Sequence, residues 1–139
     1  MTKEEIYREI EETLGTVPTV IKFVPDEYLE QEWNSWKLMM QDVGRIPAKW
    51  RELISLGIHV AAGDEYGVFY CTETAKLHGA TDEEIREVAY LAKLELGWKP
   101  FLLGNQFDYD QFKEEAKKSF ELMKSRGKVP VTGREKASI

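Results

Sequence analysis

The chain has 139 residues, of which 42% are hydrophobic and 12% aromatic. This length and composition suit one domain with a sizeable core, and the chain is too short for two. Its formal net charge of −6 and pI near 5.1 argue against nucleic-acid and anionic-membrane partners, because both would repel it. A single cysteine excludes an intrachain disulfide and fits a reducing compartment. No apolar run reaches the roughly 20 residues that are needed to cross a bilayer. We therefore expect a cytoplasmic protein with no nucleic-acid and no membrane partner.

Apolar residues recur at helical spacing through the first half of the chain, and glycine or proline follows each run. Ile6, Ile10 and Leu14 share one face of a predicted helix that Gly15 ends. The segments predicted in this half are helices over 4–14, 26–43 (ended by Gly44) and 47–62, with a small helix or turn over 17–23. Pro47 suits the first turn of its helix, where the missing N–H would have no partner.

Capping residues mark the helices of the second half. Asp64 predicts the start of a helix that runs through Cys71 to Leu77, and Thr81 with Glu84 forms a capping box for the next. The remaining predicted segments are a helix over 82–96 that stops before Gly97 and Pro100, a short apolar element over 101–107, and a helix over 110–126 capped by Gly127. The sequence thus predicts an all-α fold of about six to seven helices, with a single domain over 1–127 and a flexible tail over 128–139.

Two motifs carry a family resemblance. RELISL, followed by a short loop and a helix that closes on GATDEEI, resembles the core of the carboxymuconolactone decarboxylase and alkylhydroperoxidase D-like superfamily. In its redox members the second of these helices begins with CxxC, and a histidine lies four residues after the second cysteine and eight before GAT. In this chain those three positions are Asp64, Gly67 and Cys71, whereas Glu52 matches the glutamate of the family's proton relay.

The resemblance implies a helical bundle whose protomers pair through helix faces, typically as trimers or hexamers. A dithiol peroxidase needs an attacking thiolate and a resolving thiol, so one cysteine cannot perform that reaction within one chain. The decarboxylase branch works without CxxC, but it too is similar to the redox branch in keeping a histidine where this chain has Cys71.

Glu52 and Cys71 each allow two interpretations. Glu52 is either a surface or ion-paired residue or, as its family counterpart implies, a general acid or base held in an apolar helix. Cys71 is by default an inert packing residue, and alternatively a lone nucleophile or one-cysteine peroxidatic thiol, although no activating cation is evident nearby in the sequence.

The two histidines are the other titratable candidates. His59 lies seven residues after Glu52 and His78 seven after Cys71, so the four could line one cavity as a proton relay. That spacing is too long for a helical metal pair, and we predict no metal and no cofactor. His78 beside Gly79 has the simpler interpretation of a cation near a helix C-terminus.

Aromatic residues surround the same helix. Tyr66, Phe69 and Tyr70, with Trp36 and Trp98, could shape an apolar ligand pocket, although such stripes more often form a core or a subunit interface. The hydroxyls of Tyr66 and Tyr70 could bind a carboxylate or donate a proton.

Two functions remain open from the sequence. The first is a small-molecule enzyme, of a lyase or peroxidase-related kind, that acts on an organic acid, lactone or peroxide with Glu52 as acid or base and Cys71, Tyr66, Tyr70 or His59 assisting. The second is a non-catalytic helical homo-oligomer that binds a ligand or a partner.

Overall fold

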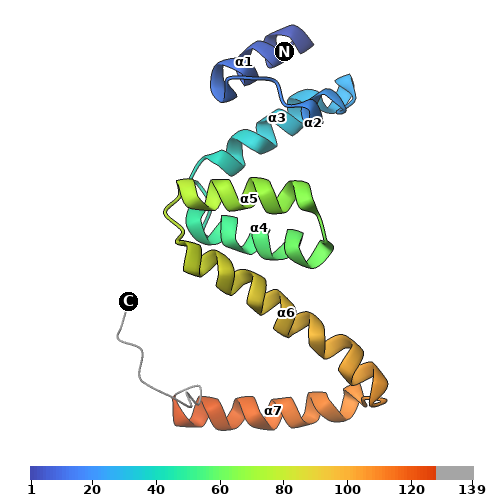
Figure 1. The fold of residues 1–139 in the computed structure, drawn as a ribbon. Helices are drawn as coiled ribbons and strands as arrows, with labels where there is room; N and C mark the ends of the chain where they lie inside the picture. The colour runs from blue at the N-terminus through green and yellow to red at the C-terminus, as the bar shows by residue number, and fades with distance from the viewer. Residues whose placement is uncertain (128–139) are drawn as a thin grey trace. The chain divides into compact units, whose positions relative to one another are not determined.

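The computed structural model describes residues 1–127, and over this range it contains seven α-helices and no strand, which confirms the all-α fold (Figure 1). The helices are α1 (Lys3–Leu14), α2 (Thr19–Lys22), α3 (Asp26–Met40), α4 (Ala48–Ala62), α5 (Glu65–Leu77), α6 (Asp82–Gly104) and α7 (Tyr109–Arg126). The chain divides into two compact units, Met1–Leu94 and a second that begins at Glu95. The single domain over 1–127 stays a prediction, and the predicted tail over 128–139 lies outside the described residues.

Helices α1 to α3 form an apolar cluster. Thr2 and Glu5 make a capping box at the start of α1, and Gly15 ends it with a φ of 77°, a conformation that glycine adopts without strain. The side chains at the centre of the cluster are each 2% exposed or less; they are Ile6, Ile10, Ile21, Leu29 and Trp33. Full burial of five such side chains makes this cluster the best-packed part of the first unit.

Helices α4 and α5 form an antiparallel hairpin (Figure 1). Pro47 precedes α4, where the Asp42 carboxylate accepts a hydrogen bond from the Ala48 N–H at 3.2 Å. Gly63 ends α4 with a φ of 71°, and Asp64 caps α5 as predicted. Leu53 of α4, Ala75 of α5 and Ala80 of the connection to α6 form a buried cluster, and Ile85 and Val88 of α6 pack against it.

The end of α3 differs from the prediction. The helix stops at Met40, whereas the sequence pattern extended it to residue 43. Arg51 of α4 donates from Nη2 to the carbonyl oxygens of Met39 at 2.7 Å and Gln41 at 3.3 Å. Because this guanidinium satisfies carbonyls at the helix end, α3 can end three residues early without leaving them unpaired.

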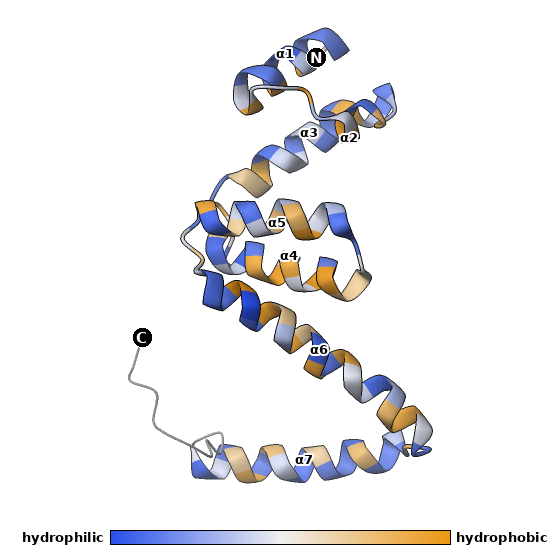
Figure 2. Cartoon of the chain, viewed as in Figure 1, coloured by the Kyte–Doolittle hydropathy of each residue, from blue (hydrophilic) through white to orange (hydrophobic). Residues whose placement is uncertain are grey.

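Helix α6 corrects the predicted stop at Leu96 and the separate element over 101–107. It continues through Gly97 and Pro100 to Gly104. Gly97 does not adopt a positive φ. Pro100 cannot donate a hydrogen bond to the Leu96 carbonyl and its ring crowds that carbonyl, yet the helix continues on both sides. The chain then leaves the helix through Gln106, whose φ is 50°, and through the bond from the Phe107 N–H to the Leu102 carbonyl. Apolar and polar residues alternate along α6 in Figure 2.

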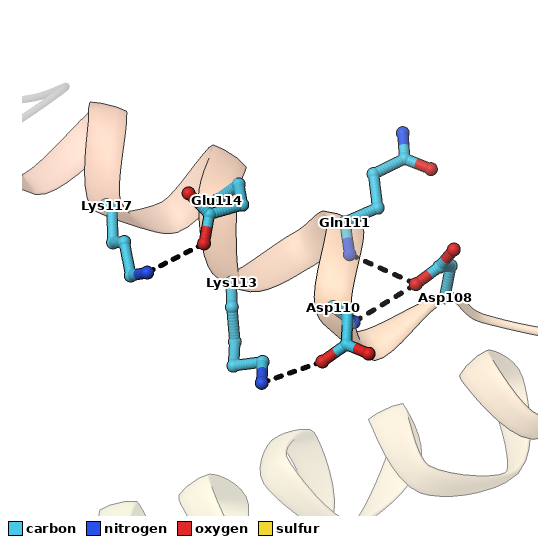
Figure 3. Close-up of polar contacts among 6 residues, drawn as sticks. All are labelled: Asp108, Asp110, Gln111, Lys113, Glu114 and Lys117. Atoms are coloured by element: carbon cyan, nitrogen blue, oxygen red, sulfur yellow. Dashed lines mark hydrogen bonds and ion pairs between the residues drawn. The ribbon is translucent and has the colours of Figure 1, made fainter.

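Helix α7 is fixed by polar contacts at its first turns (Figure 3). The Asp108 carboxylate accepts hydrogen bonds from the N–H groups of Asp110 and Gln111, both at 3.0 Å. Ion pairs Lys113–Asp110 and Lys117–Glu114, each 2.7 Å long, follow at i, i+3 spacing. Gly127 ends the helix as predicted. Across residues 1–127, no helix combines the length and the apolar character that a membrane crossing requires.

Candidate functional site

Glu52 is a buried acid in the α4–α5 hairpin. The residue is only 9% exposed, and its Oε2 accepts a hydrogen bond from the Thr74 hydroxyl of α5 at 2.7 Å. Thr74 Oγ1 also lies 2.9 Å from the Tyr70 carbonyl oxygen, one turn earlier in α5. A buried carboxyl group is costly unless it has a hydrogen-bond partner, and the Thr74 hydroxyl is that partner here.

Cys71 lies beside this acid on the same face of the hairpin. The residue is 5% exposed, and burial raises the pKa of its thiol, with the negative charges of Glu52 and then Asp64 raising it further. No basic group among these causes counters them. The environment therefore favours the protonated thiol over the thiolate that nucleophilic chemistry requires.

Two tyrosines continue the same region of α5. The rings of Tyr66 and Tyr70 stack with centroids 6.1 Å apart, and Trp36 of α3 approaches Tyr70 at 6.2 Å. Burial raises the pKa of both phenols, so each keeps its proton at neutral pH and can act as a hydrogen-bond donor. Phe69 is 71% exposed, so it is not part of the buried core.

His59 joins the two helices at the other end of the hairpin. Its Nδ1 lies 2.8 Å from Oδ2 of Asp64, and Oδ1 of the same carboxylate accepts the Gly67 N–H at 3.3 Å. A Cβ atom added at Gly67 would overlap the imidazole ring, so the ring occupies the space that any other side chain at position 67 would need. The Gly67 N–H and then the His59 hydrogen bond lower the pKa of Asp64.

The predicted site residues thus fall into two groups on one hairpin. Glu52, Cys71 and Tyr70 lie near Thr74, and Tyr66 stacks on Tyr70. His59 lies with Asp64, two turns along α4 from Glu52. His78 is the C-terminal cap of α5, in keeping with its simpler interpretation, and Trp98 contacts Phe101 within α6. Within residues 1–127 no three potential ligands gather as a metal site would require.

Sequence reasoning missed Thr74 and the partnership of His59 with Asp64. Thr74 lies 22 residues from Glu52, and only the pairing of the two helices brings them together. The Asp64 contact was easier to foresee, since a cap residue five positions after a histidine near a helix end lies within reach of it.

The α4–α5 hairpin lies within a segment that matches a known protein family. The profile described as the Carboxymuconolactone decarboxylase family matches residues 30–102, more than half of the chain. The chain belongs to this family. A search of curated proteins finds no match.

A solved structure shows the same fold. The alkylhydroperoxidase AhpD core from Rhodospirillum rubrum aligns with a TM-score of 0.58 and 21% sequence identity, over 78% of this chain and 82% of that one. This neighbour confirms the predicted helical-bundle fold. At the two positions where the resemblance places redox cysteines, this family member holds Asp64 and Gly67, the two residues that contact His59.

Proposed function

We propose that this family member is a non-redox enzyme that acts on a small organic acid or lactone, with Glu52 as the general acid or base. The observation that carries the proposal is the buried Glu52 carboxyl group held by Thr74. Burying an acid costs desolvation free energy, so a buried acid with one dedicated partner is a functional candidate.

The Thr74 hydroxyl can serve Glu52 in both protonation states. When the carboxylate is ionised, the hydroxyl donates to Oε2. When the carboxyl group is protonated, it can donate to Oγ1, and the hydroxyl proton turns to the Tyr70 carbonyl oxygen 2.9 Å away. Such a partner can stay hydrogen-bonded to a group that gives and takes a proton in one cycle.

Peroxide as a substrate through Cys71 alone has less support. The buried thiol has a raised pKa, and the nearest charges are carboxylates that disfavour the thiolate. Acid–base chemistry at Glu52 needs no thiolate, and the protonated Tyr66 and Tyr70 phenols can bind the carboxylate of an organic acid.

The test is turnover of a panel of lactones, 3-oxo acids and hydroperoxides by the wild type and by Glu52→Gln. General acid–base catalysis contributes on the order of 10²–10⁴ in rate, so the variant should lose about two orders of magnitude or more on a lactone or acid. Glu73→Gln is the matched control, since Glu73 is an exposed glutamate on α5. Equal turnover by wild type and Glu52→Gln would contradict the proposal.

A homo-oligomer, a trimer or hexamer, is the second proposal for this chain, and exposed apolar side chains support it. On α4, Ile54 and Ile58 share a face and are 52% and 63% exposed, and on α6 Leu91 and Leu94 are 48% and 46% exposed. A second copy that covers these faces would remove them from water. If the panel shows no turnover, this oligomer without catalysis is the remaining function.

Sedimentation equilibrium tests the oligomer. Leu91→Glu should lower the assembly mass, whereas Asn34→Glu, which adds the same charge at an exposed polar position of α3, should not. A wild type that sediments as a single chain at micromolar concentration would contradict this proposal.

A further inference from the structure

The His59 ring is held in one orientation by the two elements that meet at the turn of the hairpin. Asp64 is both the cap of α5 and the partner of His59 Nδ1 at 2.8 Å, so its position is fixed by the start of the helix. Gly67, one turn into α5, presents backbone alone to the ring, and any Cβ there would overlap ring atoms Nδ1, Cγ and Cε1. The imidazole therefore packs directly on the helix backbone.

The partner of Nδ1 determines which nitrogen is free. The Asp64 carboxylate is ionised at neutral pH because the Gly67 N–H and the His59 contact lower its pKa. An ionised carboxylate only accepts hydrogen bonds, so Nδ1 of the neutral ring carries the proton and Nε2 carries the lone pair. Nε2 has no hydrogen-bond partner among the described residues, and the side chain is 33% exposed.

We propose that His59, oriented by Asp64, is a general base that activates water for attack on the carbonyl of a lactone or ester. Nε2 takes a proton from water as the water oxygen bonds to the acyl carbon. The acyl carbon–oxygen bond then breaks, and the leaving oxygen takes the proton back from Nε2. This inference rests on the proposed small-molecule activity and adds to it a second group and a reaction, hydrolysis.

The contact between His59 and Asp64 can be disrupted without changing any polar group. Gly67→Ala adds one methyl group that must push the imidazole away from Asp64, while alanine itself favours the helix. Gly57→Ala is the matched control, because a Cβ there meets Val88 Cγ1 at an ordinary 3.5 Å.

The tautomer is read by ¹⁵N NMR of the imidazoles at pH 8, which are only two, His59 and His78. We expect the Nδ1–H form at His59 in wild type and Gly57→Ala, and a mixture of both tautomers in Gly67→Ala and Asp64→Asn. The His59–Asp64 dyad would be overturned if His59 carried its proton on Nε2 in the wild type, or if Gly67→Ala left the ratio of the two tautomers unchanged.

Hydrolysis is measured with p-nitrophenyl acetate and with dihydrocoumarin, an aryl lactone. His59→Gln should lower kcat about 100-fold, Asp64→Asn and Gly67→Ala about tenfold with little change in KM, and His78→Gln and Gly57→Ala should match the wild type. Circular dichroism confirms that each variant is folded.

The outcomes separate this inference from the proposed function. A wild type that hydrolyses neither probe faster than His59→Gln overturns the inference. If Glu52→Gln still abolishes turnover of a panel substrate while His59→Gln does not, the function at Glu52 stands and the base at His59 is refuted.

Discussion

The two helical assemblies of the first unit are built on different principles. In the cluster of α1 to α3 the central side chains are aliphatic or aromatic and at most 2% exposed. The α4–α5 hairpin instead places a carboxyl group, a hydroxyl, a thiol and an imidazole at its helices' contact. Apolar packing raises stability, and buried polar groups reduce it unless they are paired. The first assembly therefore contributes stability, whereas the second gives up stability to hold polar groups, as the proposed acid–base role requires.

Trp33→Ala should have the largest effect, because it empties the centre of the apolar assembly. Trp33 is 1% exposed, and truncation of a buried aromatic side chain costs about 3–5 kcal/mol. Urea unfolding measures the loss. Trp50→Ala is the control, since Trp50 is 47% exposed, and its cost should stay below about 1 kcal/mol. Equal losses for the two variants would contradict the assignment of the core.

Thr74→Val tests the polar pairing within the α4–α5 hairpin. The change keeps the shape of the side chain and removes the hydroxyl that serves Glu52. An unpaired buried polar group costs about 1–3 kcal/mol, and we expect a stability loss in that range together with reduced turnover. Thr72→Val, a half-buried threonine of the same helix, should change neither quantity. If Thr74→Val proves neutral in both unfolding and turnover, Thr74 is not the partner of Glu52.

Glu84→Gln tests a smaller contribution, at the junction of α4 and α6. Its carboxylate pairs with Lys49 Nζ at 2.7 Å and accepts the Thr81 N–H at 2.9 Å, and these contacts lower the pKa of Glu84. A lowered folded-state pKa gives stability that is present above the unfolded pKa, about 4.3, and is lost as pH falls through the folded value.

The variant should therefore be less stable than the wild type at pH 7, and the difference should vanish in acid. Thermal unfolding at pH 7 and at pH 3 gives both values, with the exposed Glu83→Gln as control. A difference that persists at pH 3 would show that packing, and not the ion pair, explains the effect.

Local signals predicted α4 and α5 closely. Pro47, Gly63 and Asp64 act through the backbone of their own neighbours, so the sequence alone defines these ends within one residue. The end of α3 depends on Arg51, twelve residues from Met39, and a local pattern does not contain that contact. Gly97 and Pro100 predicted a break in α6 because both disfavour helices on average, yet neither forbids one.

The candidate site was predictable in part. The family resemblance pointed to Glu52, and its burial agrees with an acid in an apolar helix. The partner Thr74 could not be predicted, since it depends on how α4 and α5 align. At the two positions where the resemblance places redox cysteines, the sequence alone shows only that cysteine is absent. The structure shows a capping carboxylate at the first position and a glycine packed against His59 at the second.

The central claim is that this hairpin is an acid–base site and not a thiolate site, and the pH dependence of Cys71 alkylation by iodoacetamide in the folded protein tests it most directly. We predict slow labelling, with a thiol pKa above its ordinary value that falls in Glu52→Gln, where one of the charges that raise it is gone, and stays unchanged in Glu73→Gln. Fast labelling at neutral pH, with a thiol pKa below its ordinary value and no response to Glu52→Gln, would contradict the account.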